Sequence, residues 1–223
     1  MTLNIPESLL LLSRKDDTGA QQGNFVEYAL AGGALAELFL AERLDVHPDK
    51  PKRINIISEA PLGDAYLDDC LAEIVKKGSG KSGEAYVTLL AGKSYLAATL
   101  AHTLVDRGIL RAEEKSFLIF SWTNFPEVDS TAETAMKERL AAVMFDRAEP
   151  EVADCAIIAL AQRTELLSKN FDKEELKANS RRIKGLAKGD FLPTKAAVKS
   201  IDAVQTALIV AAITPAIAAS TTS

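Results

Sequence analysis

Hydrophobic residues recur with helical spacing along most of the chain, so we predict a mainly α-helical fold. Residues 25–44 are apolar on almost every side, a pattern typical of a central helix that its neighbours cover. Amphipathic stretches over residues 66–77, 82–91 and 95–107 predict helices that pack around it. Further helices are expected over residues 5–12, 130–145, 151–171, 176–186 and 195–213.

Several of these helices carry local signals at their ends or in their middle. Gly78 and Gly108 follow the last apolar positions of two predicted helices, where glycine adopts the left-handed conformation that ends a helix. Ser130, with Glu133 three residues later, is typical of a capping box at a helix start. Gly32 and Gly33, in the middle of a predicted helix, each lower helix stability by roughly 1 kcal/mol relative to alanine. We therefore expect another helix to approach closely there.

Two short β-hairpins are predicted between the helices. Residues 44–46 and 53–58 alternate in part around a proline-containing loop, which indicates the first hairpin. The second follows Gly108 and contains four consecutive large apolar residues, 117–120. A strand with one solvent-exposed face alternates apolar and polar residues, because successive side chains point to opposite sides. This run therefore predicts a strand that is buried on both faces or that contacts lipid or a partner protein.

The composition fits one folded domain. Of the 223 residues, 48% are hydrophobic and 26% are charged, so a single domain with a substantial core is expected. We predict a single-domain helical bundle over residues 1–219 and a flexible tail over residues 220–223. The apolar stretch 203–219 is interrupted by Pro215. We interpret it as a final packed helix, because a membrane span needs about 20 uninterrupted apolar residues.

The sequence contains no residue pattern that indicates catalysis. His47 and His102 lack neighbouring ligands at metal spacing. Cys70 and Cys155 lie in helical patterns and are expected to be buried thiols. The glycine-rich loop at residues 78–83 follows a predicted helix rather than a strand, and it lacks the spacing of a phosphate-binding loop. We therefore expect a protein that is not an enzyme and has no metal and no cofactor.

The charge distribution limits the classes of partner. A net charge of −5 argues against a general nucleic-acid binder, because phosphate contacts need a concentrated basic face. Residues 181–199 nevertheless carry a local excess of positive charge. Contact with an anionic lipid surface and a solvated helix face both explain this excess. The candidates for anionic-lipid contact are Arg181, Arg182, Lys184 and Lys188.

A helix, Gly108 and a hairpin in succession also resemble a winged-helix module. Such a module needs a basic recognition helix to bind nucleic acid, and residues 95–107 offer only His102 and Arg107 beside Asp106. We therefore expect no nucleic-acid partner. The apolar hairpin then leaves two interpretations, contact with a membrane and contact with a partner protein or a second copy of the chain.

Six landmarks occur in order along nearly the whole chain: residues 6–12 (PESLLLL), 17–19 (DTG), 30–38 (LAGGALAEL), 60–64 (APLGD), 104–110 (LVDRGIL) and 117–120 (FLIF). Their collinear order resembles the Golgi phosphoprotein 3 family. The resemblance implies a mainly helical peripheral membrane protein that recognises phosphatidylinositol 4-phosphate and inserts a hydrophobic hairpin. The family's inserting segment maps onto residues 113–124. The implied membrane-hairpin residues are Phe117, Leu118, Ile119, Phe120 and Trp122.

The resemblance does not extend to the residues of the family's phosphoinositide pocket. This chain has Gln22 at the position that matches the pocket tryptophan, and it has Ala31, Ser94 and Ala97 at the positions that match the three pocket arginines. Without guanidinium groups a phosphomonoester loses its bidentate, charge-assisted hydrogen bonds. We therefore predict a cytoplasmic, peripheral membrane-associated, lipid-binding protein whose specific headgroup pocket is lost. The expected partner is an anionic membrane lipid or a phosphoinositide headgroup, and the alternative is a protein-interaction or homo-oligomerisation module that uses the hairpin.

Overall fold

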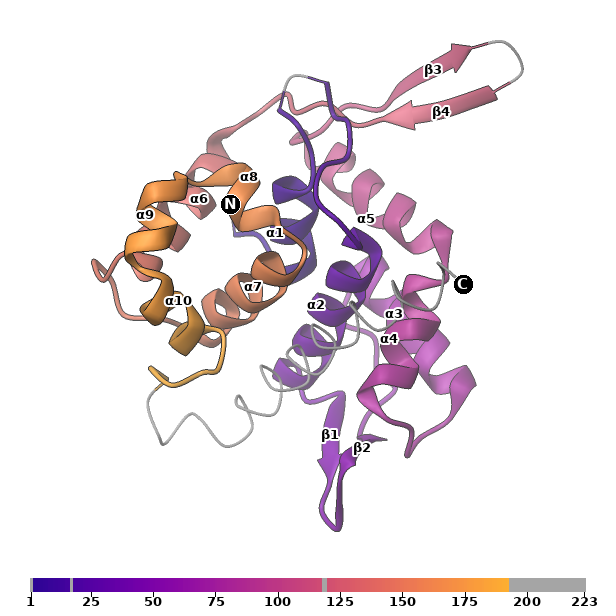
Figure 1. Ribbon diagram of the computed structural model, residues 1–223. Coiled ribbons are helices and arrows are strands. Elements are labelled where there is room, and N and C mark those ends of the chain that lie inside the picture. Colours follow the sequence, from indigo (N-terminus) through magenta and orange to yellow (C-terminus); the bar gives the residue numbers. More distant parts are fainter. Residues whose placement is uncertain (1, 17, 118–119, 193–223) are drawn as a thin grey trace, which may run out of the picture.

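The computed structural model describes residues 2–16, 18–117 and 120–192. Within these residues the chain forms ten helices and two small antiparallel sheets, which confirms the predicted mainly α-helical class (Figure 1). The helices are α1 (Ile5–Leu12), α2 (Val26–Leu40), α3 (Ala65–Lys77), α4 (Gly83–Ala91), α5 (Ser94–Asp106), α6 (Thr131–Met144), α7 (Val152–Arg163), α8 (Leu166–Asn170), α9 (Lys173–Ala178) and α10 (Ser180–Leu186). The strands are β1 (Leu44–His47), β2 (Lys50–Ile56), β3 (Glu113–Phe117) and β4 (Phe120–Asn124).

Helix α2 lies at the centre of the bundle, as its apolar residues predict. It packs against α1, α3, α4 and α7, and its residues Leu35 and Leu38 are fully buried. A Cβ atom on Gly33 would lie 3.1 Å from side-chain atoms of both Ile5 and Leu9. The expected close approach is therefore made by α1, and this packing compensates for the low helix propensity of glycine.

The start of α1 is joined to the end of α5 through the carboxylate of Glu7. Glu7 and Asn4 form a capping box, in which each side chain accepts a hydrogen bond from the other residue's backbone N–H at 2.9 Å. The guanidinium of Arg107, just after α5, pairs with Glu7 and donates to the carbonyl oxygen of Thr2 at 3.1 Å. Glu7 is only 2% exposed, so its charge is compensated almost entirely by protein groups.

The two hairpins project from opposite ends of the helical body (Figure 1). In the first, β1 and β2 pair Leu44 with Ile56 and Val46 with Ile54. Strand β2 begins at Lys50, inside the segment expected to be a loop, so the turn is shorter than predicted. The second hairpin, β3–β4, is described with the candidate site below.

One predicted helix is wrong in its second half. The pattern over residues 151–171 predicts a single helix, but Thr164 and Glu165 separate α7 from α8. Glu165 has a left-handed backbone with φ of 63°. The carbonyl oxygen of Thr164 accepts a hydrogen bond from the backbone N–H of Asn24 at 3.0 Å. This contact with a loop distant in sequence leaves no trace in the local hydrophobic pattern.

A second predicted helix, over residues 176–186, is in fact two helices. Helices α9 and α10 meet at Asn179. Helix α9 begins earlier than expected because Asp172 caps it, accepting the backbone N–H groups of Glu174 at 3.0 Å and Glu175 at 2.9 Å. The candidate basic residues therefore lie on the short helix α10 and on the turn that follows it.

The capping box predicted at the start of α6 is also wrong. Ser130 makes no capping hydrogen bond, and Asp129 instead accepts the backbone N–H of Thr131 at 3.0 Å. Glu133 does not reach back to the cap, because its buried carboxylate forms an ion pair with Lys137 at 2.6 Å. Two other local contacts have therefore replaced the predicted one.

Some predictions concern residues that lie outside the described ranges. These are the C-terminal helix over residues 195–213, the apolar stretch that continues to residue 219, and the tail over residues 220–223. In the described part of the chain, no helix has both the length and the apolarity needed to cross a bilayer. Cys70 and Cys155 are buried as predicted, and burial raises the pKa of each thiol to about 12.

Candidate functional site

The β3–β4 hairpin spans the segment predicted from the sequence, residues 113–124. Its register places Phe117 opposite Phe120 at the end of the ladder. Strand β3 ends at Phe117 and β4 begins at Phe120, so the four consecutive apolar residues do not lie in one strand, which corrects the expectation of a strand that is apolar on both faces. Leu118 and Ile119 lie outside the described residues.

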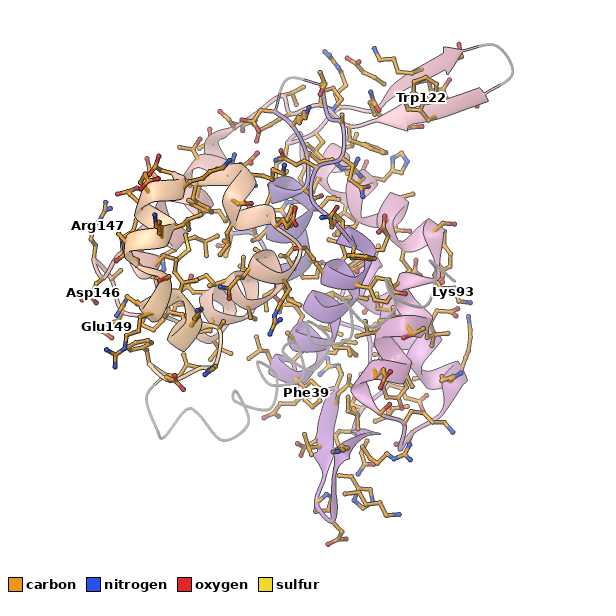
Figure 2. The ribbon with its side chains drawn as sticks, in the orientation of Figure 1. Phe39, Lys93, Trp122, Asp146, Arg147 and Glu149 are labelled. Carbon is orange, nitrogen blue, oxygen red and sulfur yellow. The ribbon has the colours of Figure 1, made fainter. Side chains whose placement is uncertain are left out.

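The stem of the hairpin alternates in the ordinary way. Lys115 lies opposite Trp122 on one face, while Ser116 lies opposite Ser121 on the other. The Trp122 side chain is 48% exposed. Figures 1 and 2 show that the hairpin projects away from the helical body and that Trp122 lies on its stem. A large aromatic side chain at such a position is available for contact with another surface.

Charged residues near the start of β3 form a small network on the hairpin stem. The carboxylate of Glu113 pairs with Arg111 and, at 2.9 Å, with Lys115. These two cations, Lys115 first, lower the pKa of Glu113 below its usual range. Because the network is largely exposed to solvent, it fixes the local geometry more than it stabilises the fold.

The base of the hairpin is anchored firmly in the body. The backbone N–H of Arg111 donates to Pro126 at 3.0 Å, and that of Val128 donates to Ile109 at 2.9 Å. Ile109, Leu110 and Phe125, which flank the two strands, are buried. The hairpin therefore combines a fixed base with a projecting stem.

Three carboxyl groups, those of Asp16, Glu127 and Glu133, lie near this base, and no pattern in the sequence indicates that they form a cluster. Glu133 is buried and ion-paired with Lys137 at 2.6 Å, and Asp16 lies 3.7 Å from the same ammonium group. The Oε1 atom of Glu127 is buried and has no hydrogen-bond donor among the described residues. Burial, followed by the neighbouring Glu133 carboxyl, raises the pKa of Glu127 to about 8. Neighbouring carboxyl groups of this kind retain a proton to a higher pH than an isolated glutamate does.

Replacing Glu127 with glutamine should stabilise the protein at pH 8 and flatten its pH dependence. The folded state retains a proton that the unfolded chain loses near its usual pKa of 4.5, so stability falls as the pH rises from there toward 8. We expect Glu127→Gln to recover about 1–2 kcal/mol at pH 8, a value reduced for the partial exposure of this side chain. Urea unfolding between pH 5 and 8 measures this difference. Equal pH profiles for Glu127→Gln and the wild type would contradict it, and the exposed Glu138→Gln is the control.

The positions implied for a phosphoinositide pocket do not form an open basic cavity. Ala31 and Ala97 both line a cavity of about 10 Å³, roughly the space of one water molecule. Lys93 also lines it, but its ammonium group is bound to the carboxylate of Glu73 at 2.8 Å. The amide group of Gln22 donates to the carbonyl oxygens of Leu12 and Arg14, each at 3.1 Å, and is thus held by the backbone.

The four basic residues predicted for anionic-lipid contact differ in their surroundings. Arg181, Lys184 and Lys188 are exposed, whereas Arg182 is bound to Asp146 at 2.7 Å and to the carbonyl oxygen of Val143 at 2.9 Å. Arg182 is therefore part of the α6–α10 packing. Helix α10 and the β3–β4 hairpin lie at opposite sides of the molecule (Figure 1), so the structure does not bring the two predicted groups together.

Comparison with known proteins gives a consistent result over most of the chain. The model of a family described as Golgi phosphoprotein 3 (GPP34) matches residues 5–204. The vacuolar protein sorting-associated protein 74 of Eremothecium gossypii is 29% identical over 167 residues, which is 66% of this chain and 50% of that protein. The protein of the same name from Schizosaccharomyces pombe is 26% identical over 166 residues, 65% of this chain and 49% of that protein. The chain thus spans about half the length of these curated relatives.

Proposed function

The chain belongs to the Golgi phosphoprotein 3 family, and we propose that it is a non-enzymatic, peripheral membrane-associated protein that binds lipid through the tip of its β3–β4 hairpin. The observation that carries this proposal is the hairpin's form, a fixed base and a projecting stem that bears the half-exposed Trp122. We place the protein on the cytoplasmic face of a membrane.

The expected strength of this contact is that of a reversible anchor. Burying one large apolar side chain stabilises an association by roughly 1.5–3 kcal/mol before entropy and orientation costs are subtracted. A few inserted residues then resemble a single lipid chain, whose membrane binding is marginal and reversible. The stem itself offers little attraction to anionic lipid, because the carboxylates of Glu113 and Glu114 balance the charges of Arg111 and Lys115.

We further propose that specific recognition of phosphatidylinositol 4-phosphate is lost or altered in this chain. Two of the implied pocket positions are occupied by Ala31 and Ala97, which enclose a cavity too small for a phosphate group. Lys93, the cation beside them, is already bound to Glu73. The headgroup would therefore lack the charge-assisted hydrogen bonds that give such a site its affinity.

The alternative candidate function is a protein-interaction or self-association module that uses the same hairpin. It is supported by two large apolar side chains near the hairpin, Trp122 and Val128, which are 48% and 52% exposed. Exposed apolar patches mark protein interfaces as well as membrane contacts. An oligomer whose mass falls to that of a monomer on substitution of Trp122, with no lipid bound, would favour this alternative.

Liposome flotation tests the membrane proposal. We expect the wild-type protein to float with anionic vesicles and the double variant Phe120→Asp, Trp122→Asp to lose about tenfold in bound fraction, since the apolar contact is removed. The matched pair Trp122→Asp and Thr123→Asp adds the same charge at neighbouring positions on opposite faces of β4. Only Trp122→Asp should bind vesicles poorly. A wild-type protein that floats with no lipid would overturn the proposal.

The headgroup proposal is tested by the same assay with a second lipid composition. Adding phosphatidylinositol 4-phosphate to vesicles of matched total charge should leave the bound fraction nearly unchanged. A gain of about tenfold or more, the scale of one charge-assisted hydrogen bond, would show instead that the headgroup is still recognised.

A further inference from the structure

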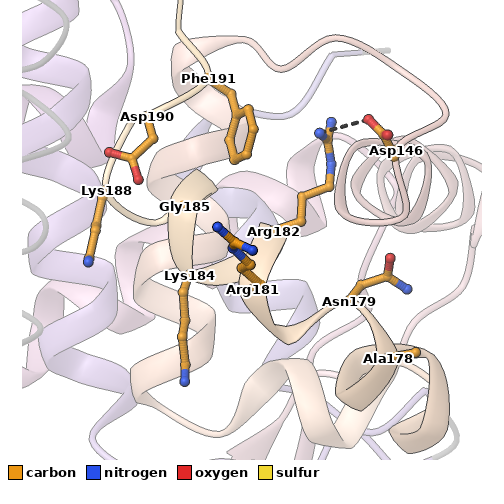
Figure 3. A pocket seen from close by; sticks show the side chains of 10 residues that line it. All are labelled: Asp146, Ala178, Asn179, Arg181, Arg182, Lys184, Gly185, Lys188, Asp190 and Phe191. Carbon is orange, nitrogen blue, oxygen red and sulfur yellow. Dashed lines mark ion pairs between the residues drawn. The ribbon is translucent and has the colours of Figure 1, made fainter.

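An open basic hollow lies over α10, on the side of the molecule away from the β3–β4 hairpin (Figures 1 and 3). Its volume is about 710 Å³. Its charged lining consists of Arg181, Arg182, Lys184, Lys188, Asp146 and Asp190. This is a local excess of positive charge on a protein whose net charge is −5.

Three of the four cations in the hollow are available to a ligand. The side chains of Arg181, Lys184 and Lys188 are exposed and have no ion pair or hydrogen bond within the described part of the chain. Arg181 and Lys184 lie on α10 and Lys188 lies on the turn that follows it, and Figure 3 shows the Lys184 and Lys188 side chains pointing in the same direction. Like charges so arranged repel one another, and an anion between them relieves this repulsion.

Arg182 and Phe191 form the fixed wall of the hollow. The guanidinium of Arg182 is held by Asp146 and lies 4.8 Å from the centre of the Phe191 ring. Gly185 allows this arrangement, because a Cβ there would lie 2.5 Å from the Phe191 ring. The ring nevertheless remains 42% exposed. The wall therefore offers an aromatic surface next to the free cations.

The charge of the hollow indicates the size of its ligand. Four cations facing two carboxylates leave a net charge of about +2, which matches a phosphate monoester of charge about −1.5 to −2 at neutral pH. A polyanion such as duplex nucleic acid would need a longer basic surface, and the carboxylates of Asp146 and Asp190 would repel it. A compact anion attached to an organic group fits both the cations and the aromatic wall.

We propose that this hollow binds a phosphate monoester, with Arg181, Lys184 and Lys188 contacting the phosphate and Phe191 contacting the organic group. The monoester comes either from a small compound in solution or from a lipid headgroup. The proposal is independent of the hairpin, since the two sites lie on opposite sides of the molecule.

Titration of the protein with phenyl phosphate and with inorganic phosphate, followed by amide chemical shifts, tests the soluble source. We expect shifts confined to α10 and the residues around Phe191. The double variant Lys184→Ala, Lys188→Ala should weaken phenyl phosphate binding about tenfold, since it removes two charge-assisted contacts. Phe191→Ala should weaken phenyl phosphate binding and leave that of inorganic phosphate unchanged. The control, Lys173→Ala with Lys177→Ala, removes the same charge from the exposed face of α9.

Flotation with phosphatidic acid vesicles tests the lipid source. This arm uses the Phe120→Asp, Trp122→Asp background, so that hairpin binding does not contribute. If Lys184→Ala and Lys188→Ala abolish the remaining flotation, and phenyl phosphate causes no chemical-shift change, the ligand of the hollow is a lipid headgroup. Absence of binding in both arms overturns the proposal. Equal weakening by the α9 control also overturns it, since binding would then depend on total charge alone.

Discussion

Gly19→Ala is expected to lower the free energy of unfolding by about 3 kcal/mol, through backbone strain together with overpacking. Gly19 has φ of +63°, and a Cβ atom there would lie 2.4 Å from both the carbonyl carbon of Phe125 and the nitrogen of Pro126. These are backbone atoms, so no side chain can rotate away. The loop before α2 must then move off the segment that leaves the hairpin. Urea unfolding measures the loss.

Gly108→Ala is the matched control for this prediction. Gly108 also has a left-handed backbone, with φ of +72°, but nothing lies within 4 Å of a Cβ built there. Its substitution should therefore cost only the conformational strain, about 1 kcal/mol. Equal losses in the two variants would show that the contact between Gly19 and the residues after the hairpin is loose.

The parts of the fold that the sequence predicted well depend on local signals. Gly78 ends α3 with φ of 86°, and the second hairpin lies between residues 113 and 124 as expected. Glycine in the left-handed region and an apolar run between polar residues are properties of short segments. They depend little on the rest of the chain, so they can be recognised before the structure is known.

The parts that failed have two kinds of cause. The break at Glu165 accompanies a hydrogen bond from Asn24 to Thr164, a contact between distant segments that no pattern within one segment contains. The cap at Ser130 fails against local competitors instead, because Asp129 accepts the backbone N–H of Thr131 and Glu133 pairs with Lys137 one turn later in the same helix.

The candidate site, too, could be predicted from the sequence only in part. The hydrophobic run at residues 117–120 predicted an apolar contact element, but only the register of the hairpin shows that Phe117 and Phe120 belong to different strands. The basic cluster was likewise visible in the sequence. That Arg182 is bound to Asp146 while Lys184 is free depends on how α6 and α10 pack. A charge count along the chain does not distinguish a structural cation from an available one.

Arg107→Met is expected to destabilise the protein by about 3–5 kcal/mol, the usual cost of leaving one partner of a buried ion pair without its counter-charge. Glu7 is 2% exposed and pairs directly with the Arg107 guanidinium. Methionine retains an apolar chain of similar reach but cannot donate to Glu7 or to the carbonyl oxygen of Thr2. Thermal and urea unfolding measure the loss.

A double-mutant cycle separates the charge from the packing in this prediction. Glu7→Gln keeps an oxygen for the backbone N–H of Asn4 and removes the buried charge, so the double variant Glu7→Gln, Arg107→Met should be more stable than Arg107→Met alone. Their interaction energy is expected to reach about 1–3 kcal/mol. Strict additivity of the two single losses would mean that water already compensates Glu7. Packing alone would then hold the start of α1 against the end of α5. The Glu7–Arg107 ion pair would contribute no more to the free energy of unfolding than an exposed surface pair does.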